Sequence, residues 1–373
     1  TPEAAKLALG ATMYHWGLHP WAIYGVVALS LAFFSYNKGL PLSIRSSFYP
    51  ILGERTWGWM GHVIDILAVL ATIFGLATSL GLGAKQAAAG INHIFGVEGG
   101  IGLQIGIIAG VTAMAVVSVV RGLDGGVKFL SNINMLIAFI LLVVVASVGF
   151  AVAVGNLPIT VGAYLENIIP LSNPHGREDE AWFQGWTVFY WAWWISWSPF
   201  VGMFIARISS GRTVREFITA VLLVPTLITI IWMSIYGGLA IDQVMSGIGA
   251  LGTDGLTDVS LAMFQMFDQL PMSTLLSVIA IVLVLVFFVT SSDSGSLVID
   301  SITAGGKVDA PVPQRIFWAS LEGAIAAVLL WVGGAEAIQA LQAGAISTGL
   351  PFTLVLLLMC ASLVMGFRTE KLT

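Results

Sequence analysis

Charged side chains are scarce in this chain, where only 9% of the 373 residues are Asp, Glu, Lys or Arg. A soluble domain carries about 25%, so this sequence cannot cover its surface with groups that suit water. Cys360 is the one cysteine, which leaves no disulfide framework, and the five histidines show no metal-ligand spacing. The net charge of −5 identifies no acidic or basic partner. These absences argue against a soluble enzyme and against a nucleic-acid-binding protein.

The chain is instead rich in hydrophobic residues, at 57% of its length, with a mean hydropathy of +0.93. Its apolar stretches reach about 18 residues or more, the length that crosses a hydrocarbon core of about 30 Å. We therefore predict an all-α polytopic membrane protein with nine spans, at residues 7–36, 61–88, 101–120, 129–155, 184–206, 215–240, 273–298, 314–334 and 343–366. An amphipathic helix and a polar loop at 156–183 are expected to lie at the interface.

Basic residues alternate between the connections of these spans, which sets the orientation because Lys and Arg accumulate in cytoplasmic loops. The basic connections hold Lys38, Arg45, Arg55, Arg121, Lys128, Arg207, Arg212, Arg215, Lys307, Arg315, Arg368 and Lys371. We therefore expect a cytoplasmic C-terminus after a short tail at 367–373. Residue 1 then falls outside the cell, which predicts an odd number of earlier spans and a chain that is a fragment.

The segment FYWAWWISWSPFVGMF, residues 189–204, holds four tryptophans at Trp191, Trp193, Trp194 and Trp197. Tryptophan faces attract desolvated cations, and a cage of aromatic rings recognises quaternary ammonium. Pro199 and Gly202 are residues that let a membrane helix break and expose its backbone to a ligand. The rings lie mid-span, away from the interfacial belt, so a ligand cage and core packing both stay open.

A second aromatic set lies in MYHWGLHPWAIY, residues 13–24. Trp21 and Tyr24 are three residues apart and share a helix face, with Trp16 one and a half turns earlier. An interfacial aromatic belt explains most membrane tryptophans, so both a belt and a ligand cage remain possible here.

Two spans carry hydroxyl groups that could bind a hard cation such as sodium. In span 61–88, small residues recur every fourth position at Ala71, Gly75, Ser79 and Gly83, which predicts close helix packing. Thr72 and Ser79 are hydroxyl candidates in the same span, and Asp65 is expected to cap or pair near its cytoplasmic end.

The segment FFVTSSDSGS, residues 287–296, has five hydroxyls and a carboxylate in an apolar helix, and an intramembrane ionisable residue is a functional-site candidate. Thr290 and Ser291 could coordinate a cation, and Asp293 could pair with Arg207 as part of a gate. A helix end with its polar face buried against neighbours is the alternative. No Lys or Arg is central in a span, which favours a mobile cation. Glu322 is an isolated acid in span 314–334.

These segments resemble the betaine/choline/carnitine transporter family. The family's eighth-helix signature is similar to WAWWISWSPFVGMFIARISSGRTVREF, residues 191–217, and HWGLHPWAIY, IDILAVLATIFGLATSLGLG and FFVTSSDS match its fourth, fifth and tenth helices. The resemblance implies a LeuT-type fold with inverted repeats, twelve helices in the full protein, and a homotrimer in a prokaryotic plasma or inner membrane. It assigns 1–155 to the remainder of the first repeat and 184–366 to the second.

The resemblance also implies site residues. Trp193, Trp194 and Trp197, with Trp191 beside them, resemble the box for a trimethylammonium group, and Trp16, Trp21 and Tyr24 resemble another box of the substrate pathway. Thr290 and Ser291 match one sodium site, and Thr72, Ser79 and Phe200 match parts of a second. Leu76 stands where the sodium-coupled pattern has a threonine, so that second site lacks an oxygen.

The expected function is sodium-coupled import of a quaternary-ammonium osmolyte, most simply glycine betaine, by alternating access, with sodium as the coupling ion and no other cofactor. A proton-coupled or exchange carrier of choline or carnitine is the nearer alternative. A membrane osmosensor or scaffold without transport is the alternative from another class. The expected partners are the small substrate and the lipid bilayer, with no nucleic acid and no enzymatic activity.

Overall fold

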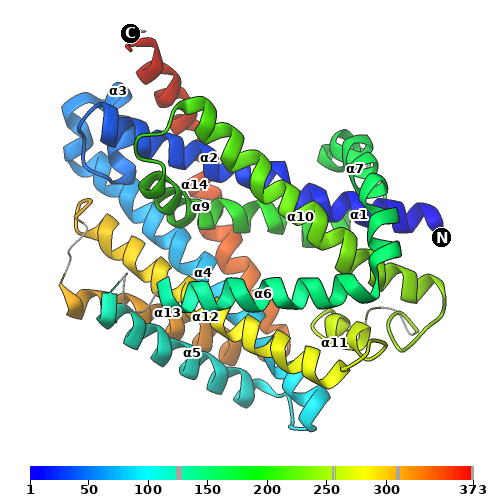
Figure 1. The fold of residues 1–373 in the computed structure, drawn as a ribbon. Helices are drawn as coiled ribbons and strands as arrows, with labels where there is room; N and C mark the ends of the chain where they lie inside the picture. Colours follow the sequence, from blue (N-terminus) through cyan, green and yellow to red (C-terminus); the bar gives the residue numbers. More distant parts are fainter. Residues whose placement is uncertain (123–127, 254–255, 257, 308–310, 371–373) are drawn as a thin grey trace.

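The computed structural model describes residues 1–122, 128–253, 256, 258–307 and 311–370, so Lys371 of the predicted tail lies outside the described residues. All the regular elements in these ranges are helical (Figure 1). The α-helices are α1 Pro2–Trp16, α2 Leu18–Ala32, α3 Tyr49–Leu52, α4 Trp59–Phe95, α5 Ile101–Gly122, α6 Lys128–Val148, α7 Phe150–Ser172, α8 Glu180–Trp182, α9 Phe189–Ile208, α10 Val214–Met245, α11 Ala262–Phe267, α12 Ser273–Thr303, α13 Val312–Gly333 and α14 Ala337–Arg368. Short π and 3-10 turns extend them at Phe33–Asn37, Ile44–Phe48, Gly53–Trp57, Phe183–Val188 and Gly334–Glu336.

Within the described ranges, nine helical stretches are long and apolar enough to cross a membrane. They confirm the all-α polytopic class, and eight of them match a predicted span one to one. The ninth is α7 rather than α9, since tryptophans, Pro199 and Arg207 lower the hydropathy of α9. Nevertheless α9 packs against α2, α4 and α14, inside the bundle. The division into two inverted repeats stays a prediction.

The predicted span 129–155 is wrong at its C-terminal end. Helix α6 stops at Val148, Gly149 leaves the helical conformation with φ −102° and ψ 24°, and α7 starts at Phe150. Figure 1 shows α7 turning away and running across the direction of α6. This course suits a helix at the membrane interface, and that placement stays a prediction.

The first predicted span is broken at Gly17, which separates α1 from α2 with φ −95° and ψ −130°. A break in a membrane helix frees backbone groups that need partners. The amide of Leu18 donates to the Tyr164 hydroxyl at 3.1 Å, and the carbonyl of His15 accepts from the Trp194 indole at 2.8 Å. Side chains from α7 and α9 therefore hold the break in place.

No break occurs where the sequence predicts one, because α9 runs unbroken from Phe189 to Ile208 through Pro199 and Gly202. Proline removes the donor that the carbonyl of Ile195 would use. The Ser198 hydroxyl replaces it, donating to that carbonyl at 2.7 Å. At Gly202 an added Cβ would lie 2.5 Å from Val27 Cγ1, so this glycine allows α2 and α9 to approach closely.

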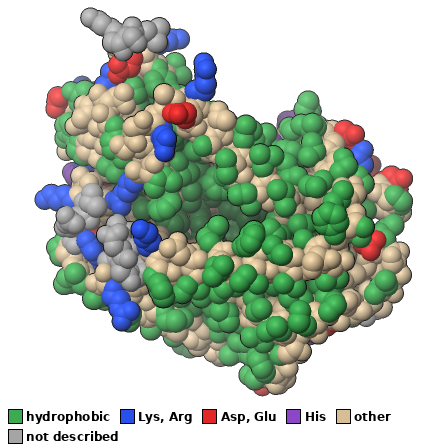
Figure 2. Space-filling model, in the orientation of Figure 1, with side chains coloured by type: hydrophobic (Ala, Val, Ile, Leu, Met, Phe, Trp, Pro, Cys, Tyr) green, Lys and Arg blue, Asp and Glu red, His purple; other side chains and the backbone are tan. Residues whose placement is uncertain are grey.

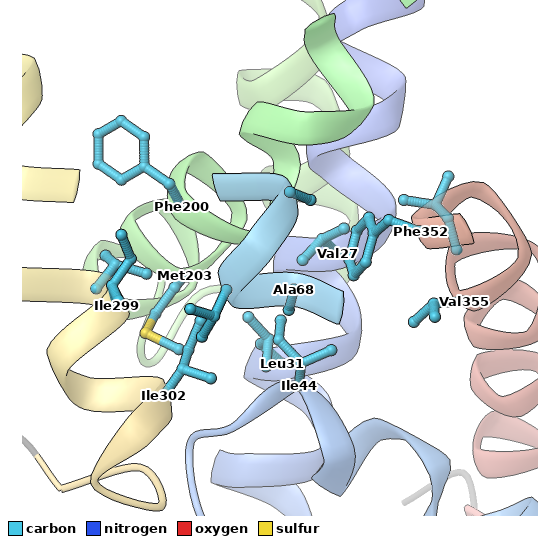
Figure 3. Close-up of a cluster of buried hydrophobic side chains, with 14 of the residues drawn as sticks. Val27, Leu31, Ile44, Ala68, Phe200, Met203, Ile299, Ile302, Phe352 and Val355 are labelled. Atoms are coloured by element: carbon cyan, nitrogen blue, oxygen red, sulfur yellow. The ribbon is translucent and has the colours of Figure 1, made fainter. Parts of the chain in front are cut away.

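The largest buried cluster joins five helices, α2, α4, α9, α12 and α14, around one apolar centre (Figure 3). Its labelled members are Val27, Leu31, Ile44, Ala68, Phe200, Met203, Ile299, Ile302, Phe352 and Val355. Burying one Val, Leu, Ile, Phe or Met side chain of this cluster stabilises the fold by about 1.5–3 kcal/mol. The cluster fixes α9 against α4, and the candidate site is built on that contact.

The small-residue stripe of α4 packs as predicted. A Cβ at Gly75 would lie 2.9 Å from Trp197 Cδ1 and 3.0 Å from Ser196 Cβ, and Gly83 lies against the Phe288 ring. Asp65, near the start of α4, pairs with Arg45 at 2.5 Å and accepts the Arg45 amide at 2.9 Å. The prediction that Asp65 caps or pairs is confirmed.

Candidate functional site

The two predicted aromatic sets form one continuous cluster between the α1–α2 break and α9. The Trp193 and Trp194 rings stack with centroids 5.3 Å apart and planes 7° apart. Trp16 meets Trp194 edge-on at 4.7 Å and 77°, and Tyr24 meets it at 6.1 Å and 85°. Edge-to-face and offset geometries of this kind are the ones that aromatic pairs prefer.

The indole nitrogens of the three tryptophans predicted to form the box all donate to protein acceptors. Trp193 donates to the Ser79 hydroxyl at 3.0 Å, Trp197 to the Gly75 carbonyl at 3.0 Å, and Trp194 to the His15 carbonyl at 2.8 Å. These bonds satisfy the polar edge of each indole and fix its orientation. The ring faces are therefore what these three side chains can still offer a ligand, and the face of an indole ring attracts a cation.

Not every predicted ring joins the cluster. Trp197 lies one turn further along α9, and its ring pairs with Phe200 at 5.5 Å. Trp191 points to another side of α9, where it meets Tyr14 at 4.9 Å and His19 at 5.4 Å. Trp21 reaches the cluster only through Tyr24, at 5.5 Å. The ring-to-ring contacts therefore group Trp193, Trp194, Trp16 and Tyr24. The side chains of Trp191, Trp197 and Trp21 still pack against the buried hydrophobic cluster around Tyr24 and Trp194.

Sequence reasoning missed Tyr190, which touches three rings of the cluster: Trp16 at 5.8 Å, Trp193 at 5.8 Å and Trp194 at 6.0 Å. Its position four residues before Trp194 places both rings on one face of α9, and that spacing could have identified it. His15 was also missed. Its ring is buried, stacks on Tyr190 at 4.9 Å and lies 3.0 Å from the Thr187 hydroxyl.

Figure 2 shows a hollow lined by hydrophobic side chains between α10 and α6, on the side where α9 lies in Figure 1. A second hollow of about 470 Å³ lies between α5 and α13 and is bordered by Ile105, Ile108, Thr112, Ser320, Gly323 and Ala327. This second hollow has no aromatic or charged lining residue, so it offers a quaternary ammonium neither a ring face nor an opposite charge.

The first predicted sodium pair, Thr290 and Ser291, lies between three and four turns before the C-terminal end of α12. Thr290 donates its hydroxyl hydrogen to the Phe287 carbonyl at 2.9 Å, which leaves its oxygen free to accept. Ser291 is buried. Two adjacent hydroxyl oxygens are suitable hard ligands, and this sodium site stays a prediction.

The structure does not bring the second predicted sodium set, Thr72, Ser79 and Phe200, together around one point, and Phe200 packs against the Trp197 ring. Thr72 and Ser79 lie seven residues apart on the unbroken helix α4, a rise of about 10 Å, whereas hard-cation bonds are about 2.5 Å. Ser79 already donates to Gly75 at 3.0 Å, and Thr72 donates to Ala68 at 2.8 Å. Between them Leu76 is buried against Gly295 of α12 and supplies no oxygen.

The predicted ion pair between Asp293 and Arg207 is absent. Asp293 accepts from the Ser118 hydroxyl of α5 at 2.6 Å and from Ser294 at 3.0 Å. Arg207 instead donates to the Ser301 hydroxyl at 3.1 Å, two turns further along α12. The carboxylate and the guanidinium are thus held on different partners, and this structure gives no support to a gate made from the two.

Comparison with known proteins decides the family. A family model described as BCCT, betaine/carnitine/choline family transporter, matches residues 1–372. The chain belongs to the betaine/choline/carnitine transporter family. Members of this family are transporters, which confirms the prediction of a multi-pass membrane protein that is not an enzyme.

Three relatives within this family illustrate the similarity. The chain is 76% identical over 371 residues to glycine betaine transporter 1 of Vibrio parahaemolyticus, covering 100% of this chain and 71% of the relative. It is 69% identical over 368 residues to a glycine betaine/proline/choline/ectoine transporter of the same organism, covering 99% and 66%. It is 42% identical over 378 residues to a glycine betaine transporter of Bacillus subtilis, covering 100% and 72%. The chain thus spans about two thirds of the length of these relatives.

Proposed function

We propose that the full-length protein imports a quaternary-ammonium osmolyte, glycine betaine, together with sodium, by alternating access. The main support is the cluster formed by the rings of Trp16, Tyr24, Trp193 and Trp194. The indole nitrogens of Trp193 and Trp194 already donate to protein acceptors, which fixes the orientation of these two rings. A desolvated cation over such a ring face gains about 2 kcal/mol or more. The names of the relatives support betaine as the substrate.

Sodium is proposed to bind at Thr290 and Ser291, with further ligands from outside these two residues. The second proposed ion loses support because Leu76 fills the position between Thr72 and Ser79. A single sodium per cycle is therefore the simpler proposal. The homotrimeric assembly and the cytoplasmic C-terminus are proposed with it, on the family likeness and on the distribution of Lys and Arg.

Uptake of labelled glycine betaine by the full-length protein in proteoliposomes tests this function. With sodium outside and potassium inside, we expect uptake that collapses when external sodium is replaced by potassium at equal ionic strength. Equal uptake in the two media would contradict sodium coupling. Uptake driven by an imposed pH gradient without sodium would select a proton-coupled carrier instead.

Choline is the second candidate substrate, because the relative that is 69% identical carries choline in its name. Choline shares the trimethylammonium group that the aromatic cluster would hold and lacks the carboxylate of betaine. Competition of unlabelled choline and carnitine against labelled betaine separates the candidates. Betaine uptake that resists a large excess of both supports betaine as the substrate, and stronger inhibition by choline than by betaine itself supports the alternative.

A further inference from the structure

A buried carboxylic acid lies far from the aromatic cluster in sequence, in the middle of α13. Glu322 has 0% exposure, and neither of its carboxyl oxygens makes a hydrogen bond of normal geometry, although the Ser292 hydroxyl lies beside it. An uncompensated carboxylate in such a place costs several kcal/mol, so buried charges are normally paired or coordinate a metal ion. The sequence alone marks Glu322 only as isolated, because its burial depends on α5 and α12.

The surroundings of Glu322 come from the neighbouring helix α12. Glu322 lies beside Ser292 and close enough to Asp293 for the two acids to interact. The Ser292 hydroxyl is itself buried without a hydrogen bond of normal geometry, and Asp293 has 0% exposure. Asp293 accepts from Ser118 of α5 at 2.6 Å and from Ser294 at 3.0 Å. Two acids and three hydroxyls thus meet where α5, α12 and α13 pack together.

No base balances these acids within the part of the chain that the structure describes. The ion pairs found there involve other carboxylates, such as Asp65 with Arg45 and Asp300 with Arg315. The atoms that make no hydrogen bond of normal geometry, both Glu322 oxygens and the Ser292 hydroxyl, are oxygen ligands of the kind that hard cations take. A cation between α12 and α13 would satisfy all of them at once and neutralise one of the two charges.

We propose that Glu322, Ser292 and Asp293 form a binding site for a sodium ion that ties α13 to α12. This site is distinct from the proposed coupling pair Thr290 and Ser291, since its anchor is a carboxylate on another helix. The inference does not rest on betaine transport. It concerns an ion that the protein holds without substrate.

Binding of radioactive sodium to the purified full-length protein, without betaine, tests the site. A background variant carrying Thr290→Ala and Ser291→Ala removes the proposed coupling ligands, and we expect it to retain sodium binding. Adding Glu322→Gln to this background should weaken the remaining binding by about 10- to 100-fold, because even an outer partner of a bound metal has an effect of that size. Sodium should also raise the melting temperature of the background variant and should not raise that of the triple variant.

Glu336→Gln is the matched control, because Glu336 is an exposed acid just beyond the end of the same helix and should leave sodium binding unchanged. Should the Glu322→Gln protein fail to fold, Ser292→Ala removes one neutral ligand and should still weaken binding several-fold. Unchanged sodium affinity after either substitution would overturn the proposal. So would a Glu322→Gln protein that is more stable than its parent in sodium buffer, since the acid would then be a neutral, protonated group.

Discussion

Replacing Trp193 by leucine isolates the contribution of one aromatic face to substrate binding. Trp193 is half-buried, and its indole donates to the Ser79 hydroxyl at 3.0 Å. Ser79 keeps its own bond to the Gly75 carbonyl at 3.0 Å, so removing the indole leaves no donor on Ser79 without a partner. Leucine keeps an apolar side chain at this position and loses the ring face.

The expected loss follows from the cation–π energy of about 2 kcal/mol for a desolvated pair. Since 1.4 kcal/mol corresponds to a tenfold change, Trp193→Leu should raise the apparent KM for betaine by about 30-fold. Trp193→Phe keeps a weaker ring face and should give an increase of only a few-fold. The order Trp, Phe, Leu is the signature of a ring that faces a cation, because packing alone would rank leucine close to phenylalanine.

The assay is uptake of labelled betaine at fixed sodium concentration, normalised to the amount of protein in the membrane. Trp331→Leu serves as the matched control, since this tryptophan of α13 is 72% exposed and belongs to no aromatic cluster described above. An apparent KM for Trp193→Leu within about threefold of the unmodified protein would refute the reasoning.

Three further predictions concern the scaffold of the site. Gly202→Leu should lower the melting temperature of the full-length protein markedly, because even a Cβ there would lie 2.5 Å from α2, whereas Gly102→Leu has nothing within 4 Å and should not. Ser198→Ala should destabilise the protein by about 1–3 kcal/mol in thermal unfolding, because the Ile195 carbonyl loses its hydrogen-bond donor. In the double variant, Pro199→Ala restores a backbone amide donor for that carbonyl and should remove the loss of stability. Asp65→Asn removes half of a buried ion pair and should cost about 3–5 kcal/mol, and no change in melting temperature would contradict that interpretation.

Hydrophobic length and composition were sufficient to predict the helical class and most span positions, because lipid requires every backbone group to bond within its own helix. Helical spacing also predicted part of the aromatic arrangement, since Trp21 and Tyr24, three residues apart, share a helix face and their rings meet at 5.5 Å. It also predicted close packing along α4, where Gly75 lies against Trp197.

Features that depend on partners from distant segments could not be predicted from the sequence. Proline at position 199 suggested a break, yet the adjacent Ser198 supplies the missing donor and the helix continues. The real break falls at Gly17, where Tyr164 and Trp194 provide hydrogen bonds from two other helices. A hydrogen bond in which a side chain takes the place of a backbone partner leaves no periodic pattern in the sequence.

The merging of the two aromatic sets has the same cause. Trp16 and Trp194 are separated by most of the first half of the chain, and only the packing of α2 against α9 brings their rings to 4.7 Å. Pairing of Asp293 with Ser118 rather than with Arg207 likewise follows from the position of α5. Charge complementarity alone favoured the arginine, and helix packing decided against it.

The central claim is that aromatic faces recognise the positive charge of the substrate and not only its shape. Competition by tert-butylacetate, the carbon isostere of glycine betaine, tests this most directly, because it has the same outline and carboxylate without the cationic nitrogen. In sodium medium, we predict that unlabelled betaine displaces labelled betaine from the full-length protein and that the isostere fails to do so at about 30-fold higher concentration. Equal displacement by the two compounds would contradict recognition through the rings of Trp16, Tyr24, Trp193 and Trp194.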